Sequence, residues 1–508
     1  MSSAFHIIAS SRCQLGLERA ANHDSGENAP EIQLGNEQAA KHEKKEIRLL
    51  PVRYFFHAIY QKQPAIYRST HETYRISETR HNCPLLRAFS MDWDDVAALL
   101  RHCHHEHTTT GTSPPLIFQN GIAITDPYTL YASNPHAAYL DGCSIIINHA
   151  DLHHPIIAQL CNNLQQTFPH VYANAYLTPA CSHAVAAHAD DRDVLVMQIL
   201  GRKKWKVYKK VPVEYPFEKE QAGKNGNKID SSVLRGGLCF NNKDVILGQG
   251  DILYLPRGYV HEATTEDFDG VTSGYEPSFH VTLAIATHDW CLSVLLSETI
   301  RQTLDSVTHF RMALPIGPSE EYTGFGSDEN SSITENPCLT QQLSEAMSLI
   351  QSAMTPDLVE QRLREKYRIH NAHAYEHRQR ILSTQQSKKR KSIDDNNGCV
   401  GSAAASSLCL HSVVRLSTPQ ERDSVSMDEG RLRGLTVRKE TISILMKILS
   451  KLKSDTDLKV AIKDLLDIAI SDDVEIDRTS LSMVCDFTLL SFARCCVELG
   501  ALAVERLS

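Results

Sequence analysis

A histidine and an aspartate lie one residue apart, at His188 and Asp190, directly before the apolar run 194–200. In an extended segment, residues i and i+2 point to the same face, so both side chains can bind one ion. Two ligands do not complete a metal site, and a His-x-Asp pair alone is usually accidental. The pair is informative only if a third ligand comes from another part of the chain.

The segment 248–263, GQGDILYLPRGYVHEA, offers a third ligand. Its glycines and proline predict tight turns on both sides of an apolar strand, and His261 follows the second turn. Two histidines and one carboxylate form the facial triad of non-haem Fe(II) oxygenases, which leaves coordination positions open for a co-substrate and oxygen. We therefore predict that His188, Asp190 and His261 bind Fe(II) and are the catalytic residues.

The usual co-substrate of such iron centres is 2-oxoglutarate, whose far carboxylate needs a buried cation. Lys203 opens a predicted strand and has the compact charge on a long stem that suits this role. Asn174 and Tyr176 share one face of the strand before His188, and Thr282 lies on the polar face of the strand 278–286. The alternatives are a solvated strand-end lysine for Lys203 and ordinary packing roles for the other three residues.

Short apolar runs alternate with turn residues from about 115 to 290, which predicts an all-β sandwich or barrel. One helix, 154–168, interrupts the strands, and a second helix is expected at 84–103 with its N-cap near Asp92. The segment 213–244 is rich in Lys, Gly and Asn and forms an insertion between strands.

The remaining organisation follows from composition and helical periodicity. The predicted parts are a disordered leader at 1–45, the oxygenase domain at 46–292, a helical domain at 293–382, a polar linker at 383–407 and a small α+β domain at 408–508.

Composition narrows the class of protein. The 508 residues carry 61 acidic and 52 basic side chains, a net charge of −9, which does not favour nucleic-acid binding by the whole chain. No stretch approaches the ~18 apolar residues of a membrane span, and no basic segment precedes the apolar N-terminal residues, so we expect neither a membrane partner nor a secretory signal. The 14 cysteines form no C-x-x-C pair, which favours reduced thiols over a disulfide framework.

Two further clusters have competing interpretations. The histidines of 102–107 look like metal ligands but lack a paired second half, so a solvated helix end is favoured. The basic run Lys388–Lys391 is either a nuclear-import patch or a charged hinge.

The motifs NAYLTPACSHAVAAHADDRDVLVMQILGRKKWKVY, GDILYLPRGYVHEA and FHVTL together resemble the JmjC-type ribosomal oxygenases. The resemblance covers about residues 46–295. By order and size alone, 293–382 corresponds to that family's dimerisation domain and 408–508 to its winged-helix domain. Ala184 and Ala187 depart from the family's usual glycine and proline, and Ala284 from its usual serine.

The resemblance implies an α+β chain with a double-stranded β-helix core. It implies Fe(II) on His188, Asp190 and His261, and the 2-oxoglutarate carboxylate on Lys203 with Asn174 and Tyr176 nearby. It further implies a nuclear, nucleolar homodimer that uses O2 to hydroxylate a histidine of a ribosomal protein, with histone lysine demethylation as a second activity.

Two alternatives stay open. One is the same oxygenase chemistry on another target, such as a ribosomal arginine or a small molecule. The other is a non-catalytic chromatin or ribosome-assembly scaffold built on an inactive barrel. Succinate release by the purified protein distinguishes the enzyme from the scaffold.

Overall fold

The structure of the 508-residue chain is a computed structural model. It describes residues 15–19, 55–69, 84–110, 114–119, 121–124, 135–183, 185–265, 277–285, 288–312 and 337–391, and in the C-terminal part 408–409, 411–416, 447–448, 450–452, 454, 458–470, 484–498 and 502–506. The chain divides into two compact units, Met1–Ile285 with Glu376–Ser508, and Ala286–Tyr375.

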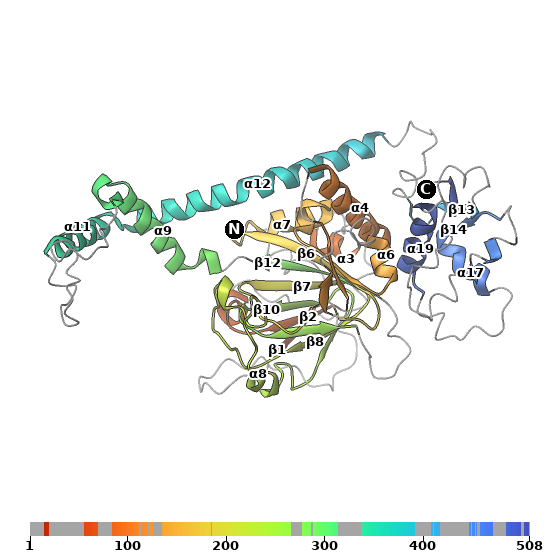
Figure 1. Cartoon of the computed structure of the whole chain (residues 1–508), viewed down its shortest axis with the longest axis horizontal. Helices are drawn as coiled ribbons and strands as arrows, with labels where there is room; N and C mark the ends of the chain where they lie inside the picture. The colour runs from red at the N-terminus through yellow and green to blue at the C-terminus, as the bar shows by residue number, and fades with distance from the viewer. Residues whose placement is uncertain are drawn as a thin grey trace, which may run out of the picture. The chain divides into compact units, whose positions relative to one another are not determined.

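In the first unit, the part up to Ile285 has a large antiparallel sheet and a three-stranded one among its described residues, and the expected β architecture is confirmed (Figure 1). The large sheet has the order β1-β2-β10-β7-β12-β6-β5-β3-β4, and the small sheet has the order β11-β8-β9. The strands of the large sheet are β1 Leu15–Arg19, β2 Ala65–Ser69, β3 Leu116–Gln119, β4 Ile122–Ile124, β5 Ser144–Ile147, β6 Val171–Thr178, β7 Asp193–Leu200, β10 Ile252–Leu255 and β12 Ser278–Ile285. Those of the small sheet are β8 Lys203–Val207, β9 Val245–Leu247 and β11 His261–Thr264.

The strands β7, β10 and β12 of the large sheet are buried on both faces, which explains their near-continuous apolar sequences. Val194 and Val196 of β7 pack with Trp205 and Val207 of β8, so the two sheets face each other across one core. The alternate residues of β7, such as Leu195, belong to a second core on the opposite face. Because successive side chains of a strand point to opposite faces, both faces demand apolar residues.

Helices cover the face of the large sheet that is turned away from the small one (Figure 1). They are α3 Pro84–Phe89, α4 Trp93–Thr110, α6 Pro135–Leu140 and α7 Pro155–Leu164, and the short α8 Ser231–Arg235 lies in the insertion between β8 and β9. The expected helix at 84–103 is thus two helices. Asp92 caps the second one, because its side chain accepts a hydrogen bond from the Asp95 backbone N–H at 3.0 Å.

The expectation of a disordered leader is wrong for residues 15–19. These residues form β1, which pairs antiparallel with β2 from Leu15 opposite Ser69 to Arg19 opposite Ala65. The polar, aperiodic sequence gives no local signal for this strand. It forms because β2 offers a free edge of N–H and C=O groups that an extended segment can pair with.

The second unit contains α9 Leu292–Asp305, α11 Pro337–Ala353 and the first part of α12 Pro356–Lys391. The helical domain was expected at 293–382, whereas this unit ends at Tyr375 and α12 continues beyond it. The linker expected from residue 383 therefore begins inside a helix. The segment 383–391 contains no Gly or Pro and is rich in Gln, Lys and Arg, which are good helix formers. Residues 392–407 lie outside the described residues.

The C-terminal part of the first unit has a small sheet, β14-β13-β15, with strands β13 Val413–Leu416, β14 Val460–Ala461 and β15 Leu502–Arg506. Its helices are α17 Leu465–Ile470 and α19 Asp486–Glu498. This mixture agrees with a small α+β domain, and the winged-helix assignment stays a prediction. Within the described part of the chain, no helix combines the length and apolarity that a membrane crossing requires.

Candidate active site

The backbone holds His188 and His261 directly opposite each other. The His188 N–H donates to the His261 carbonyl at 3.0 Å, and the His261 N–H donates to the His188 carbonyl at 2.9 Å. In an antiparallel pair, two residues that exchange both hydrogen bonds project their side chains to the same face. The two imidazole rings consequently lie with their centroids 4.6 Å apart.

Each of these histidines has its Nδ1 turned to a backbone carbonyl. His188 Nδ1 lies 2.7 Å from the Ala186 carbonyl, and His261 Nδ1 lies 3.0 Å from the Tyr259 carbonyl. A carbonyl only accepts, so Nδ1 carries the hydrogen and the Nε2 lone pair is free. Burial, followed by the neighbouring histidine, lowers the pKa of His188 to about 3, and burial also lowers the pKa of His261. Both rings are therefore neutral near pH 7, as metal binding requires.

Asp190 brings the carboxylate to the same point. Its Oδ1 lies 3.8 Å from His188 Nε2 and its Oδ2 lies 3.7 Å from His261 Nε2. Burial alone would raise the pKa of Asp190, but Lys224 and the two histidines lower it below its usual range. The Gly258 N–H fixes the backbone by donating to the Asp190 carbonyl at 2.9 Å. Gly258 has φ +90°, and a Cβ there would lie 2.6 Å from the Val213 carbonyl oxygen, so the turn needs glycine.

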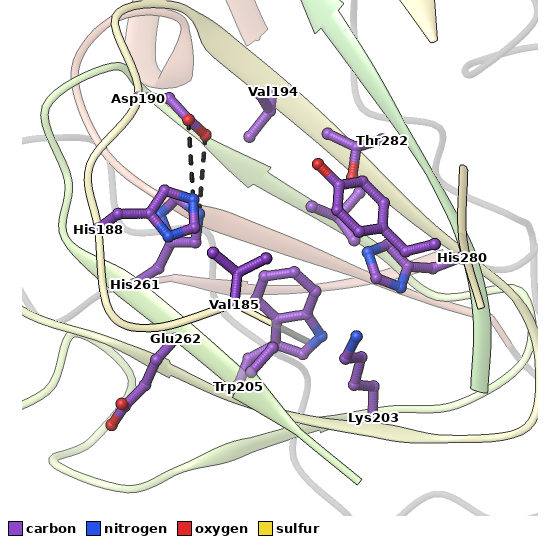
Figure 2. A pocket seen from close by; sticks show the side chains of 13 residues that line it. Val185, His188, Asp190, Val194, Lys203, Trp205, His261, Glu262, His280 and Thr282 are labelled. Carbon is purple, nitrogen blue, oxygen red and sulfur yellow. Dashed lines mark ion pairs between the residues drawn. The ribbon is translucent and has the colours of Figure 1, made fainter. Parts of the chain in front are cut away.

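The three side chains open onto a cavity of about 50 Å³ between the two sheets (Figure 2). Figure 2 shows Asp190 pointing toward the two histidines, with Lys203 across the cavity and Trp205 between them. The lining consists of Tyr176, Val185, His188, Asp190, Val194, Val196, Lys203, Trp205, His261, Glu262, Ala263, His280 and Thr282. A polar group thus stands at each end of a largely apolar chamber.

Lys203 is 1% exposed and donates to Thr178 Oγ1 at 2.8 Å. Among the described residues it forms no ion pair with a carboxylate, and burial lowers its pKa to about 7. Burial and the nearby Lys203 charge also lower the pKa of His280 well below its usual value. An isolated buried ammonium is costly, so the site is suited to an anionic ligand that supplies the missing charge.

The other residues expected at the cofactor differ in position. Tyr176 stacks flat on His280, with ring centroids 4.7 Å apart, and both line the cavity with Thr282. Asn174 is not among the lining residues, and its side-chain oxygen accepts a hydrogen bond from the His149 N–H at 3.0 Å. The structure thus brings Lys203, Tyr176 and Thr282 to one chamber with the triad and places Asn174 beside it.

Residues 149–284 match the family model described as the JmjC domain. This stretch is a JmjC domain. It contains His188, Asp190, His261, Lys203 and every other residue that lines the cavity.

Several curated proteins named bifunctional lysine-specific demethylase and histidyl-hydroxylase NO66 share this domain. The protein of Drosophila mojavensis is 34% identical over 182 residues, which are 35% of this chain and 19% of that protein. The protein of Drosophila melanogaster is 32% identical over 183 residues, 35% of this chain and 26% of that protein. The protein of Aedes aegypti is 28% identical over 227 residues, 44% of this chain and 32% of that protein. The chain therefore matches a fifth to a third of these relatives' length.

Solved structures that resemble the chain include YcfD, a ribosomal oxygenase from Escherichia coli, in complex with cobalt and 2-oxoglutarate. The identity is 13%, the TM-score is 0.38, and the alignment covers 90% of this chain and 99% of that one. YcfD in complex with cobalt and succinic acid is similar at 14% identity and a TM-score of 0.37, covering 90% and 99% of the two chains.

Sequence reasoning missed a residue that contacts the triad of the JmjC site. Lys224, from the insertion 213–244, places its Nζ 2.5 Å from Asp190 Oδ1. Its only local signal is the glycine- and asparagine-rich turn AGKNGN, which says nothing about where the turn docks. Of the clusters that the sequence left open, the side chains of 104–107 and of Lys388–Lys391 lie outside the described residues.

Proposed function

We propose that this chain is an Fe(II)- and 2-oxoglutarate-dependent oxygenase that hydroxylates a histidine of a ribosomal protein. One observation carries the proposal: two neutral histidines and a carboxylate converge at one end of a chamber, and a buried ammonium without a carboxylate partner among the described residues lies at the other. The first group suits a metal with open coordination positions, and the second suits the far end of a dicarboxylate.

The donor set fits Fe(II). His188 Nε2 and His261 Nε2 present lone pairs because their Nδ1 hydrogens are held by backbone carbonyls, and Asp190 supplies the negative charge. Bound there, the iron with its co-substrate would supply the oxidising power to insert one oxygen atom of O2 into a C–H bond. The chain's own contribution is to bring three ligand atoms, from His188, Asp190 and His261, to one point at the chamber.

The chamber fits 2-oxoglutarate. Lys203 Nζ, held by Thr178, is placed to bind the distal carboxylate, and Thr282 and Tyr176 offer hydroxyl groups from the neighbouring strands. Asn174, outside the lining, lies two residues before Tyr176 on the same face of β6 and would act through it. Val194 and Val196 close the wall, which excludes water and strengthens the ammonium–carboxylate attraction.

The target is proposed from the names of the relatives and from the resemblance in the motifs. Histidine hydroxylation and lysine demethylation are both printed in the relatives' name. One oxygenase site can do both, because hydroxylation of an N-methyl group yields an unstable product that loses the methyl carbon. We extend the proposal to a nuclear, nucleolar location, to a histone as a second substrate, and to a homodimer formed through residues 293–382, which sedimentation equilibrium of the full chain tests.

The test is oxidation of a panel of ribosomal-protein and methylated histone peptides by anaerobically purified protein with Fe(II) and 2-oxoglutarate, read by mass spectrometry. We expect a gain of one oxygen atom on a histidine, lost in His188→Ala and in Asp190→Ala. His183→Ala is the matched control, because His183 is exposed and lies outside the chamber lining.

The outcomes separate the alternatives. Succinate release without any peptide product keeps the oxygenase and rejects the histidine target. Neither succinate nor bound metal rejects the enzyme and favours the binding scaffold.

A further inference from the structure

The insertion 213–244 packs against the segment that carries His188 and Asp190. The Ala189 N–H, between the two expected ligands of the His-x-Asp pair, donates to the Ala222 carbonyl at 2.9 Å. Gly223 follows with φ +77°, and a Cβ there would lie 2.4 Å from the Ala187 carbonyl oxygen. Its N–H donates to the Asn227 carbonyl at 2.9 Å, which closes the turn that carries Lys224. The insertion is thus seated by backbone contacts against the ligand-bearing segment.

This seating aims Lys224 at the triad carboxylate. Its Nζ lies 2.5 Å from Asp190 Oδ1, the oxygen that also lies 3.8 Å from His188 Nε2. The Lys224 side chain is 34% exposed and that of Asp190 is 19% exposed, so the ammonium can leave toward solvent. Among the described residues, Asp190 is the acidic partner that Lys224 contacts.

We propose that Lys224 is a tethered cation that competes with the divalent metal for Asp190, so that the insertion sets the metal affinity of the site. The inference rests on the proposed function, because it takes the triad to be a metal site. A carboxylate that is largely buried without a partner would destabilise the fold, and Lys224 supplies the partner when the metal is absent. Metal entry then replaces one cation by another at the same carboxylate.

The size of the effect follows from Coulomb's law. A unit charge that stays a few ångströms from a bound dication repels it even in a water-like environment. If the lysine swings away, its ion pair with Asp190 is lost instead, and either route weakens metal binding. A lysine suits this role better than an arginine, since its ammonium is compact, strongly hydrated and carried on a flexible stem.

The experiment measures binding of Co(II) alone to the full chain by isothermal titration calorimetry, without co-substrate. Lys224→Met removes the charge and keeps the length of the side chain, and Lys219→Met, an exposed lysine of the same insertion, is the matched control. We expect Lys224→Met to bind Co(II) roughly tenfold more tightly than the native chain, and Lys219→Met to bind as the native chain does. Circular dichroism confirms that each variant is folded.

Each result decides the matter. Equal affinity in Lys224→Met and the native chain overturns the inference and leaves the proposed function standing. Weaker binding in Lys224→Met also overturns it and makes Lys224 a residue that orients Asp190. If no form binds Co(II), or if His188→Ala binds as well as the native chain, the metal site and the proposed function both fail.

Discussion

Among the described residues of the first compact unit, two basic side chains, Arg378 and Lys203, are fully buried, and they are partnered in opposite ways. Arg378, in the last part of α12, is 0% exposed and contacts an aspartate, two amide side chains and a backbone carbonyl. Lys203, on β8, is 1% exposed and donates to one threonine hydroxyl. The first charge is satisfied by the fold itself, whereas the second requires something that the fold does not supply.

The Arg378 site joins the end of α12 to the edge of the JmjC domain. Its Nε lies 2.7 Å from Asp151 Oδ2, and its Nη1 lies 2.7 Å from Gln165 Oε1. All three guanidinium nitrogens have acceptors, and such full hydrogen bonding is what makes a buried ion pair tolerable. The comparison teaches that burial of a charge alone does not identify a ligand site; the missing counter-charge does.

The largest expected effect is on stability, and it comes from removing Arg378, the buried cation whose charge the fold itself pairs. Arg378→Met should lower the free energy of unfolding by about 3–5 kcal/mol, because it leaves Asp151 buried and unpaired. Urea unfolding followed by circular dichroism measures it. Arg380→Met, an exposed arginine two residues on, should change stability by less than about 0.5 kcal/mol. A small change in the free energy of unfolding for Arg378→Met would show that the Arg378–Asp151 ion pair does not stabilise the fold.

The second prediction concerns Lys203, the buried cation that has no carboxylate partner among the described residues. Lys203→Met should weaken 2-oxoglutarate binding by roughly 100-fold and leave the unfolding free energy unchanged or raised, because it removes an unpaired buried charge. Lys204→Met, on the opposite face of β8, should retain the native affinity. Calorimetric titration of 2-oxoglutarate into the metal-loaded protein tests both, and a large loss of stability in Lys203→Met would contradict the distinction.

The third prediction uses the pKa of Lys203, which burial lowers to about 7. A bound carboxylate favours the charged lysine, so binding takes up a proton above pH 7, and the affinity for 2-oxoglutarate should fall by up to about tenfold per pH unit. The free energy of unfolding of the ligand-free protein should instead increase as the pH rises above 7. Between about pH 7 and the ordinary lysine pKa the unfolded chain binds the extra proton, so stability rises with pH. Lys203→Met should abolish this contribution to both slopes.

The smallest expected effect concerns Thr178, the hydrogen-bond partner of Lys203 among the residues that the structure describes. Thr178→Val removes the hydroxyl that accepts from Lys203 Nζ and should weaken 2-oxoglutarate binding by about two- to tenfold. Its effect should nearly vanish in the Lys203→Met background, which a double-mutant cycle measures. Additive losses would mean that Thr178 acts on the ligand independently of the lysine.

The sequence predicted the parts of the site that lie on regular strands. His188 and Asp190 precede an apolar run, and His261 follows a glycine–proline turn, so local patterns predict that these residues lie at strand ends. The same reasoning placed Lys203, Tyr176 and Thr282 on strands, which are β8 and the two paired strands β6 and β12. Their convergence on one chamber follows from strand pairing that the apolar patterns only imply.

The remainder depends on contacts between distant segments. Lys224 reaches Asp190 because the turn at Gly223 fits against Ala187, and no periodicity in 213–244 encodes that docking. The strand β1 pairs with the edge of β2, and Arg378 of α12 contacts Asp151, so both contacts join segments that lie far apart in the sequence. Asn174 was expected at the cofactor because it shares a face with Tyr176, but it lies two residues away along β6 and is not among the residues that line the chamber.

The strand order also has a consequence for synthesis of the protein. β6 and β7 are consecutive in the chain, but β12 lies between them in the sheet, with all eight of its residues buried. The ribosome must therefore make residues 201–277 after β7 before the gap can be filled. At a synthesis rate of about 5–20 residues per second, the edges of β6 and β7 stay unpaired for on the order of ten seconds before β12 is made. This delay is the interval in which the nascent chain most needs protection from aggregation.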